Sequence, residues 1–156
     1  MSFAGSVWAY RALSLPLHGD TVALFSETVQ REDGTKARML QRHARITILY
    51  WWASWCPYCA DEFQQLQKVK KRYGSAVEVI ALNRGESLEV IHSFTAPFRS
   101  NGIVFLNDAD DSVFKKIGGY AMPETLFISR KGQIIAHQHG PSGEGELEAL
   151  VERELR

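Results

Sequence analysis

The most informative scarcity in this 156-residue sequence is that of cysteine, because only Cys56 and Cys59 are present. Two cysteines three positions apart cannot build the framework of several disulfides that staples small secreted folds, so the fold must rely on an apolar core. Hydrophobic residues make up 45% of the chain and aromatic residues 11%. This length and apolar content predict one domain, spanning 1–156, with a single continuous core.

An excess of charge of one sign is also missing, because 18 lysines and arginines balance 18 aspartates and glutamates. Without a net positive field, we expect no nucleic-acid partner. No stretch reaches the roughly 20 apolar residues of a membrane-spanning helix, so no membrane span is expected. The first residues lack the basic region and apolar run of a signal peptide, and an export leader is therefore expected to be absent from this chain, with Met1–Ser6 in its place.

Strand-like and helix-like patterns alternate from residue 45 onward, which is typical of an α/β fold. The Arg130–Gly132 turn predicts an antiparallel hairpin at one edge, so the sheet should be mixed. Hydrophobic periodicity and turn residues predict strands at 45–52, 77–83, 103–106, 125–129 and 133–139, and helices at 57–73, 87–98, 111–117 and 144–155.

The N-terminal part is less regular. Turn residues at His18–Asp20 and at Glu32–Gly34 each separate residues of strand-like content, which favours β-hairpins. Residues 35–42 also suit a short helix, and this alternative stays open. Residues 1–22 are expected to be an N-terminal extension of uncertain structure.

The two cysteines stand in the segment Cys56-Pro57-Tyr58-Cys59, directly between a predicted buried strand and a predicted amphipathic helix. This position places the first sulfur at a helix N-terminus, where unpaired N–H groups and the helix dipole favour a thiolate. Pro57 suits the first helical turn, because its missing N–H would have no partner there. Cys59 is expected one turn inward, where it can resolve a mixed disulfide formed at Cys56.

Two other interpretations of the cysteines remain open, namely two inert buried thiols or one half of a zinc site. A zinc site needs further ligands, and the candidates are His137 and His139, because residues two apart on a strand face the same side. No second cluster of cysteine or histidine lies nearer in the sequence. We therefore expect solvated histidines and no metal site.

The residues around the cysteines, Trp52–Phe63 (WASWCPYCADEF), resemble the active-site stretch of thioredoxin-like proteins of the TlpA/ResA family. Residues 119–135 (GYAMPETLFISRKGQII) look like the family's segment with a cis-proline, a strand and a turn. Within this segment, the sequence Pro123-Glu124-Thr125 most resembles the CcmG/DsbE branch of the family, which acts in cytochrome c maturation. The resemblance covers about residues 24–156 and implies a thioredoxin fold, with a central mixed β-sheet flanked by helices and an N-terminal β-hairpin extension.

The resemblance also implies a substrate-binding surface beside the cysteines. Pro123 would be the cis-proline packed against them, and the backbone of Met122 would pair with an extended substrate segment. Trp55 would form part of an apolar rim around an exposed sulfur. Pro57 and Tyr58, the dipeptide between the cysteines, would line the same surface and tune the redox potential.

Proton transfer at Cys59 requires a base. Thioredoxins proper carry a buried aspartate six residues before the first cysteine, but Tyr50 occupies that position here. Glu62 matches the acidic residue of TlpA/ResA relatives and, held beside apolar neighbours, would have a raised pKa suited to proton transfer. Glu124, directly after Pro123, is a second candidate by resemblance to the cytochrome c maturation branch.

These features predict a thiol-disulfide oxidoreductase that reduces disulfides in partner proteins, with apocytochrome c among the candidates. The alternatives are a disulfide oxidase or isomerase, or a non-catalytic metal-binding or scaffold module. A peroxidase is disfavoured, because Ala53 stands where peroxiredoxins carry threonine three residues before the reactive cysteine.

The resemblance further implies an upstream thioredoxin-like electron donor and a disulfide-containing protein substrate. No cofactor beyond the redox-active disulfide is expected. We expect a monomer that works in the periplasm or another extracytoplasmic space, with the cytoplasm as the alternative.

Overall fold

A computed structural model describes residue 24, residues 26–39 and residues 44–156 of the chain. Within that part, a seven-stranded sheet has the order β2-β1-β5-β4-β3-β6-β7. The strands are β1 Thr28–Gln30, β2 Lys36–Arg38, β3 Ile46–Trp52, β4 Val77–Asn83, β5 Val104–Asn107, β6 Glu124–Ser129 and β7 Ile134–His139. No helix of the described residues has the length and apolar content needed to cross a membrane.

The sheet is mixed, as the sequence predicts. The central strand β3 pairs parallel to β4 and antiparallel to β6. β4 and β5 are parallel, whereas β7 forms an antiparallel hairpin with β6 at one edge. The expected edge hairpin is therefore confirmed.

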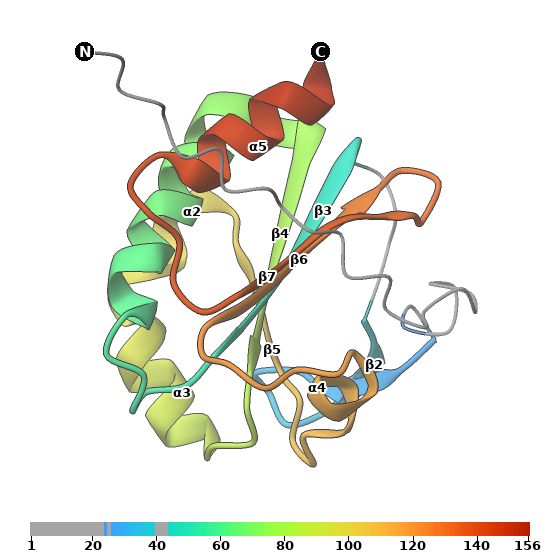
Figure 1. Cartoon of the computed structure of the whole chain (residues 1–156). Coiled ribbons are helices and arrows are strands. Elements are labelled where there is room, and N and C mark those ends of the chain that lie inside the picture. The colour runs from blue at the N-terminus through green and yellow to red at the C-terminus, as the bar shows by residue number, and fades with distance from the viewer. Residues whose placement is uncertain (1–23, 25, 40–43) are drawn as a thin grey trace.

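Helices cover both faces of the sheet (Figure 1). The helices are α2 Cys59–Tyr73, α3 Leu88–Thr95, α4 Ser112–Lys116 and α5 Glu146–Leu155, with 3₁₀ turns at Gly74–Ala76 and Ala96–Asn101. Buried residues of α2, α3 and α5 share one hydrophobic cluster, and those of α4 belong to another. We call the two sides of the sheet the α2 face and the α4 face.

The apolar interior is divided by the sheet, so the expected single continuous core is wrong. Every residue of β3 is buried, and its side chains alternate between the two faces. Tyr50 and Trp52 belong to the cluster on the α2 face, and Leu49 and Trp51 to the cluster on the α4 face. A sheet covered on both sides has two apolar layers, and Met122 packs against both of them.

On the α2 face, aromatic rings hold the helix against the sheet. The Phe63 ring of α2 lies edge-on to Tyr50 and Trp52, with centroid distances of 4.9 and 5.4 Å, and stacks on Phe98 at 4.9 Å. Aromatic pairs at these separations stabilise a core by about 0.5–1.5 kcal/mol beyond burial of their area. These contacts fix α2, and therefore the cysteine at its start, relative to β3.

Several element ends differ from the sequence predictions. The second predicted turn joins β1 to β2, which are antiparallel, so a helix over 36–38 is excluded; the first, His18–Asp20, lies outside the described residues. α3 ends at Thr95 and not at Phe98, because Pro97 has no N–H to donate to the helix, and the chain continues as the 3₁₀ turn Ala96–Asn101.

Candidate active site around the cysteine pair

Cys56 and Cys59 lie where β3 ends and α2 begins, and they form a disulfide with a Cα–Cα distance of 5.5 Å. The chain turns tightly there, since the Cys56 N–H donates to the Ala53 carbonyl (3.2 Å) and the Cys59 N–H to the Cys56 carbonyl (3.4 Å). α2 starts at Cys59, so Pro57 and Tyr58 form the turn before the helix and not its first residues. Cys56 thus precedes the helix N-terminus.

The two cysteines differ in accessibility. Cys56 is 4% exposed and Cys59 is completely buried. The expected exposed sulfur is therefore nearly covered, although Trp55 and Tyr58 on either side of it are exposed aromatic residues. An incoming sulfur can approach Cys56 but not Cys59, which favours attack at Cys56.

A hydrogen-bonded network fixes the loop before the cysteines. The Glu86 carboxylate accepts hydrogen bonds from the Ser54 N–H (2.8 Å), from the Ser54 hydroxyl (2.5 Å) and from the buried Asn83 side-chain amide (2.7 Å). Burial alone would raise the pKa of Glu86, but the hydrogen bonds from Ser54 and Asn83 outweigh it and lower the pKa. An ionised Glu86 therefore anchors the loop.

Glu62 is buried on the α2 face with three hydrogen-bond donors around its carboxyl group. The Thr125 hydroxyl donates to Oε1 (3.1 Å), as does the Ser142 hydroxyl (3.1 Å), and the Ser142 N–H donates to Oε2 (3.0 Å). Burial raises the pKa of Glu62, and the hydrogen bonds from Ser142 and Thr125 reduce that rise without cancelling it. The expected raised pKa of this carboxyl is found.

Tyr50, which stands where thioredoxins proper carry aspartate, is a hydrogen-bond donor. Its hydroxyl donates to the backbone carbonyl of Cys59 over 3.1 Å. Burial, and next the charge of Glu62, raise the pKa of Tyr50 well above its ordinary value. Tyr50 therefore stays protonated and holds the start of α2, while the carboxyl group of the site is Glu62.

The Met122–Pro123 peptide bond is cis, as the resemblance implies. It immediately precedes β6, whose residue Thr125 is bonded to Glu62. Met122 packs against the hydrophobic cluster that contains both cysteines. The cis-proline segment and the cysteine helix are thus joined through one apolar layer and one hydrogen bond.

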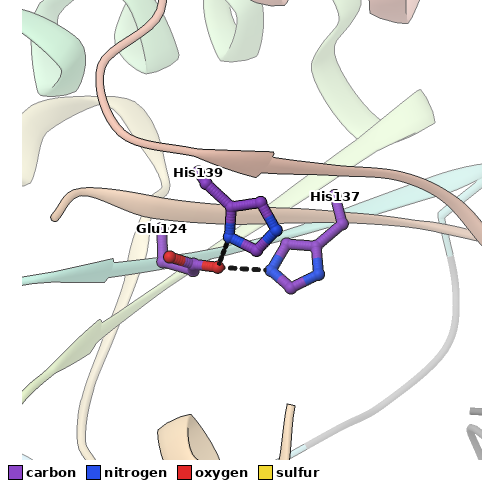
Figure 2. A group of neighbouring side chains, drawn as sticks. All are labelled: Glu124, His137 and His139. Atoms are coloured by element: carbon purple, nitrogen blue, oxygen red, sulfur yellow. Dashed lines mark hydrogen bonds and ion pairs between the residues drawn. The ribbon is translucent and has the colours of Figure 1, made fainter. Parts of the chain in front are cut away.

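Glu124 lies on the other side of the sheet. Antiparallel pairing aligns Thr125 with Tyr50 and Glu124 with Trp51, and paired residues share a face. Glu124 therefore lies on the α4 face, and Figure 2 shows it beside His137 and His139. Its location favours Glu62 over Glu124 for proton transfer at Cys59.

The expectation of solvated histidines is wrong. The side chains of His137 and His139 are 7% and 19% exposed, and a ring nitrogen of each lies close to the buried Glu124 carboxylate. They do share one side of β7, as the alternation predicts, with ring centroids 4.1 Å apart.

Sequence reasoning missed the polar residues that support the site, namely Ser54, Asn83, Glu86 and Ser142. Asn83 and Glu86 carry a signal, because β4 runs parallel to β3 and polar residues at the ends of neighbouring parallel strands meet at one sheet edge. Ser142 carries none, since it lies 80 positions from its partner Glu62 in the sequence.

A cysteine pair between the central strand and a helix, a cis-proline before a neighbouring strand, and a mixed sheet flanked by helices define a thioredoxin-like protein. The chain belongs to the Redoxin family, whose model matches residues 17–152. The expected thioredoxin fold, with a mixed sheet flanked by helices, and the family resemblance are therefore confirmed, whereas the N-terminal hairpin extension stays a prediction.

Curated relatives are similar over part of their length. The thiol:disulfide interchange protein DsbE of Allochromatium vinosum is 31% identical over 62% of this chain and 52% of its own length. The thiol-disulfide oxidoreductase ResA of Bacillus subtilis is 28% identical over 66% of this chain and 58% of its own length. The chain thus spans a little more than half the length of these relatives.

Solved structures agree on the fold. A secreted Mycobacterium tuberculosis disulfide oxidoreductase, described as homologous to Escherichia coli DsbE, superimposes with a TM-score of 0.70 at 20% identity. The match covers 85% of this chain and 98% of that one. This similarity supports the thioredoxin-like fold over nearly all of the described residues.

Proposed function

We propose that this protein is a thiol-disulfide oxidoreductase that reduces disulfide bonds in partner proteins through Cys56 and Cys59. The observation that carries the proposal is the disulfide between these residues at the end of β3, with Cys56 slightly accessible and Cys59 fully buried. The relatives named thiol:disulfide interchange protein and thiol-disulfide oxidoreductase support the same chemistry.

The proposed reaction begins with the reduced pair. The Cys56 thiolate attacks one sulfur of a substrate disulfide, which breaks that bond, forms a mixed disulfide and releases the other substrate sulfur as a thiolate that takes up a proton. Cys59 then loses its proton and attacks the Cys56 sulfur, and the second substrate thiol leaves. The substrate gains two electrons and two protons, and the protein ends with the Cys56–Cys59 disulfide.

Glu62 is proposed to accept the proton of Cys59. It lies one helical turn further along α2 and is buried, and its raised pKa suits a group that takes and returns protons. Ser142, which donates twice to this carboxyl, is half-buried, so Glu62 has a neighbour in partial contact with solvent. A proton held on Glu62 therefore has a route outward.

The substrate is proposed to lie across the exposed aromatic residues Trp55 and Tyr58, with Pro57 between the cysteines. Met122 and Pro123 would offer backbone to an extended segment, a binding mode that tolerates varied sequences. Glu124 lies on the α4 face and is not part of this proposed surface.

Cytochrome c maturation is the proposed setting, by similarity to proteins named DsbE. It implies apocytochrome c as the substrate, a thioredoxin-like electron donor and an extracytoplasmic location. We further propose a monomer that uses no cofactor beyond its cysteine pair.

The direct test is insulin reduction with dithiothreitol as the electron source. The wild-type protein should accelerate precipitation of the insulin B chain, and Cys56→Ser should reduce the rate to the uncatalysed level while the circular dichroism spectrum is unchanged. Turnover retained by Cys56→Ser would overturn the proposal. A Cys59→Ala variant should instead accumulate a covalent complex with substrate, and mass spectrometry of proteins trapped this way would identify the physiological partner.

Direction of electron flow is a separate question, which the reduction potential answers. A value near roughly −270 mV indicates a reductant, whereas one near roughly −120 to −180 mV indicates the alternative, an oxidase or isomerase.

A further inference from the structure

The α4 face carries a second group of chemically active side chains that the redox mechanism does not use. Glu124, His137 and His139 each offer a ligand atom, and these atoms lie within 4.8 Å of one another. Figure 2 shows the three side chains pointing toward one another from two neighbouring strands. The His137 Nε2 atom is 2.6 Å from Glu124 Oε1, and His139 Nδ1 lies beside the same oxygen.

Strand geometry builds this group. His137 and His139 are two apart on β7 and so project from the same face. In the antiparallel register with β6, Glu124 is the direct partner of His139 and the diagonal neighbour of His137. All three side chains are thus presented by adjacent, hydrogen-bonded strands, which is a rigid support for a site.

Two neighbours orient the ligands further. The Ala121 N–H donates to Glu124 Oε2 over 3.1 Å, which leaves Oε1 directed at the histidines. The ring of Tyr120 stacks on His139, with centroids 4.3 Å apart and an angle of 24° between the planes. Outer contacts of this kind fix ligand orientation in metal sites.

One ligand atom of this group has no hydrogen-bond partner within the described part of the chain, and a bound cation would supply one. One carboxylate oxygen faces two imidazole nitrogens, and Glu124 is completely buried. The His139 Nδ1 atom that faces this oxygen is among the buried side-chain nitrogens without a hydrogen-bond partner in the described residues. A metal ion bound by the three residues would give the His139 Nδ1 atom a partner, in place of the present contact between His137 and Glu124.

We propose that Glu124, His137 and His139 bind a divalent transition-metal ion, with Zn²⁺ as the reference ion. Two imidazoles and one carboxylate are a ligand set that Zn²⁺ accepts, at bond lengths of about 2.0–2.2 Å. In a tetrahedral site such bonds place ligand atoms about 3.4 Å apart, so the histidine rings would move outward from the 2.6 Å that now separates His137 Nε2 from Glu124 Oε1. Three protein ligands leave a fourth position for water or an external ligand.

This site is separate from the cysteine pair, because Glu124 and Trp51 lie on the α4 face, whereas Tyr50 and Cys59 belong to the cluster on the α2 face. It also differs from a zinc site shared between the cysteines and the histidines. The protein should therefore bind metal with its disulfide closed, when neither sulfur is available as a thiolate ligand.

The test uses oxidised protein, stripped with EDTA and dialysed, and titrated with ZnCl₂ by calorimetry at neutral pH. We expect one equivalent to bind. His137→Gln and His139→Ala should each weaken binding by at least about tenfold, because even outer contacts of metal sites are worth that much. The matched control is His92→Gln, which changes an exposed histidine of α3 and should leave the affinity unchanged.

Further measurements make each outcome decisive. CoCl₂ in place of ZnCl₂ should give visible absorption bands that disappear in His137→Gln, and circular dichroism should show both variants folded. Absence of stoichiometric Zn²⁺ binding to the oxidised wild-type protein would overturn the proposal. So would equal affinity in His137→Gln and wild type, or binding that requires reduced cysteines.

Discussion

Two buried glutamates on opposite faces of the same sheet have different surroundings. Glu62, on α2, accepts hydrogen bonds from hydroxyl and amide groups of Thr125 and Ser142. Glu124, the first residue of β6, is paired with two imidazoles. Thr125 and Glu124 are consecutive residues, so one step along β6 takes the chain from one site to the other.

The difference shows that burial alone does not determine what a carboxyl group does. Neutral donors leave Glu62 able to gain and lose a proton, which suits acid–base work beside Cys59. Imidazole nitrogens instead give Glu124 partners that share its capacity to bind a cation. Strand register separates the two sites, because it places Thr125 on the α2 face beside Glu62 and Glu124 on the α4 face.

The largest expected effect follows from neutralising Glu62. Glu62→Gln keeps the size of the side chain but cannot accept a proton, so insulin-reduction turnover should fall by about 10²-fold, the lower end for general acid–base groups. Asp61→Asn, an exposed neighbour on α2, should retain wild-type turnover. A larger loss of turnover in Glu124→Gln than in Glu62→Gln would contradict the proposal that Glu62 transfers the proton of Cys59.

The next effect concerns the free energy of unfolding, whose dependence on pH should differ between wild type and Glu62→Gln. Its pKa is raised above the ordinary 4.5, so the folded state keeps the proton to higher pH than the unfolded chain. The stabilisation is therefore complete below the unfolded pKa and is lost as the pH rises through the folded pKa, at about 1.4 kcal/mol per unit of difference.

Urea unfolding of wild type and Glu62→Gln across pH 4 to 8 provides the measurement. Groups other than Glu62 cancel in the difference between the two free energies of unfolding. This difference should shift in favour of Glu62→Gln as the pH rises. A difference that is constant with pH would mean that the pKa of Glu62 is the same in the folded and unfolded states.

The smallest effect concerns a third carboxylate, Glu86, whose pKa is lowered where that of Glu62 is raised. Ser54→Ala removes the hydroxyl donor at 2.5 Å and should cost about 1.5 kcal/mol of unfolding free energy, the value for a hydrogen bond to a charged group. Ser93→Ala, at an exposed position on α3, should cost less than about 0.5 kcal/mol. Equal losses of unfolding free energy in the two variants would contradict the claim that Glu86 anchors the loop before the cysteines.

Much of the fold could be predicted from the sequence, because its signals are local. The strand and helix periodicities and the Arg130–Gly132 turn identify β3 to β7 and the four helices to within a few residues. The cysteine spacing identifies the redox pair, since its chemistry depends on residues three apart.

The rest depended on long-range packing. Nothing local indicates that Ser142 meets Glu62 or that Glu124 meets His137, because these contacts arise only when β6, β7 and the loop before α5 are assembled. The resemblance placed Glu124 beside the cysteines, and the register placed it on the opposite face. Burial of the two histidines was missed for the same reason.

The central claim, that Cys56 attacks and Cys59 resolves, is tested most directly by competition between the two thiols. Freshly reduced protein would be given less than one equivalent of iodoacetamide at pH 7, and the modified cysteine located by peptide mass spectrometry. The account predicts that nearly all of the label lies on Cys56, because Cys59 is fully buried and Cys56 precedes the helix N-terminus. Equal labelling, or labelling mainly on Cys59, would contradict it.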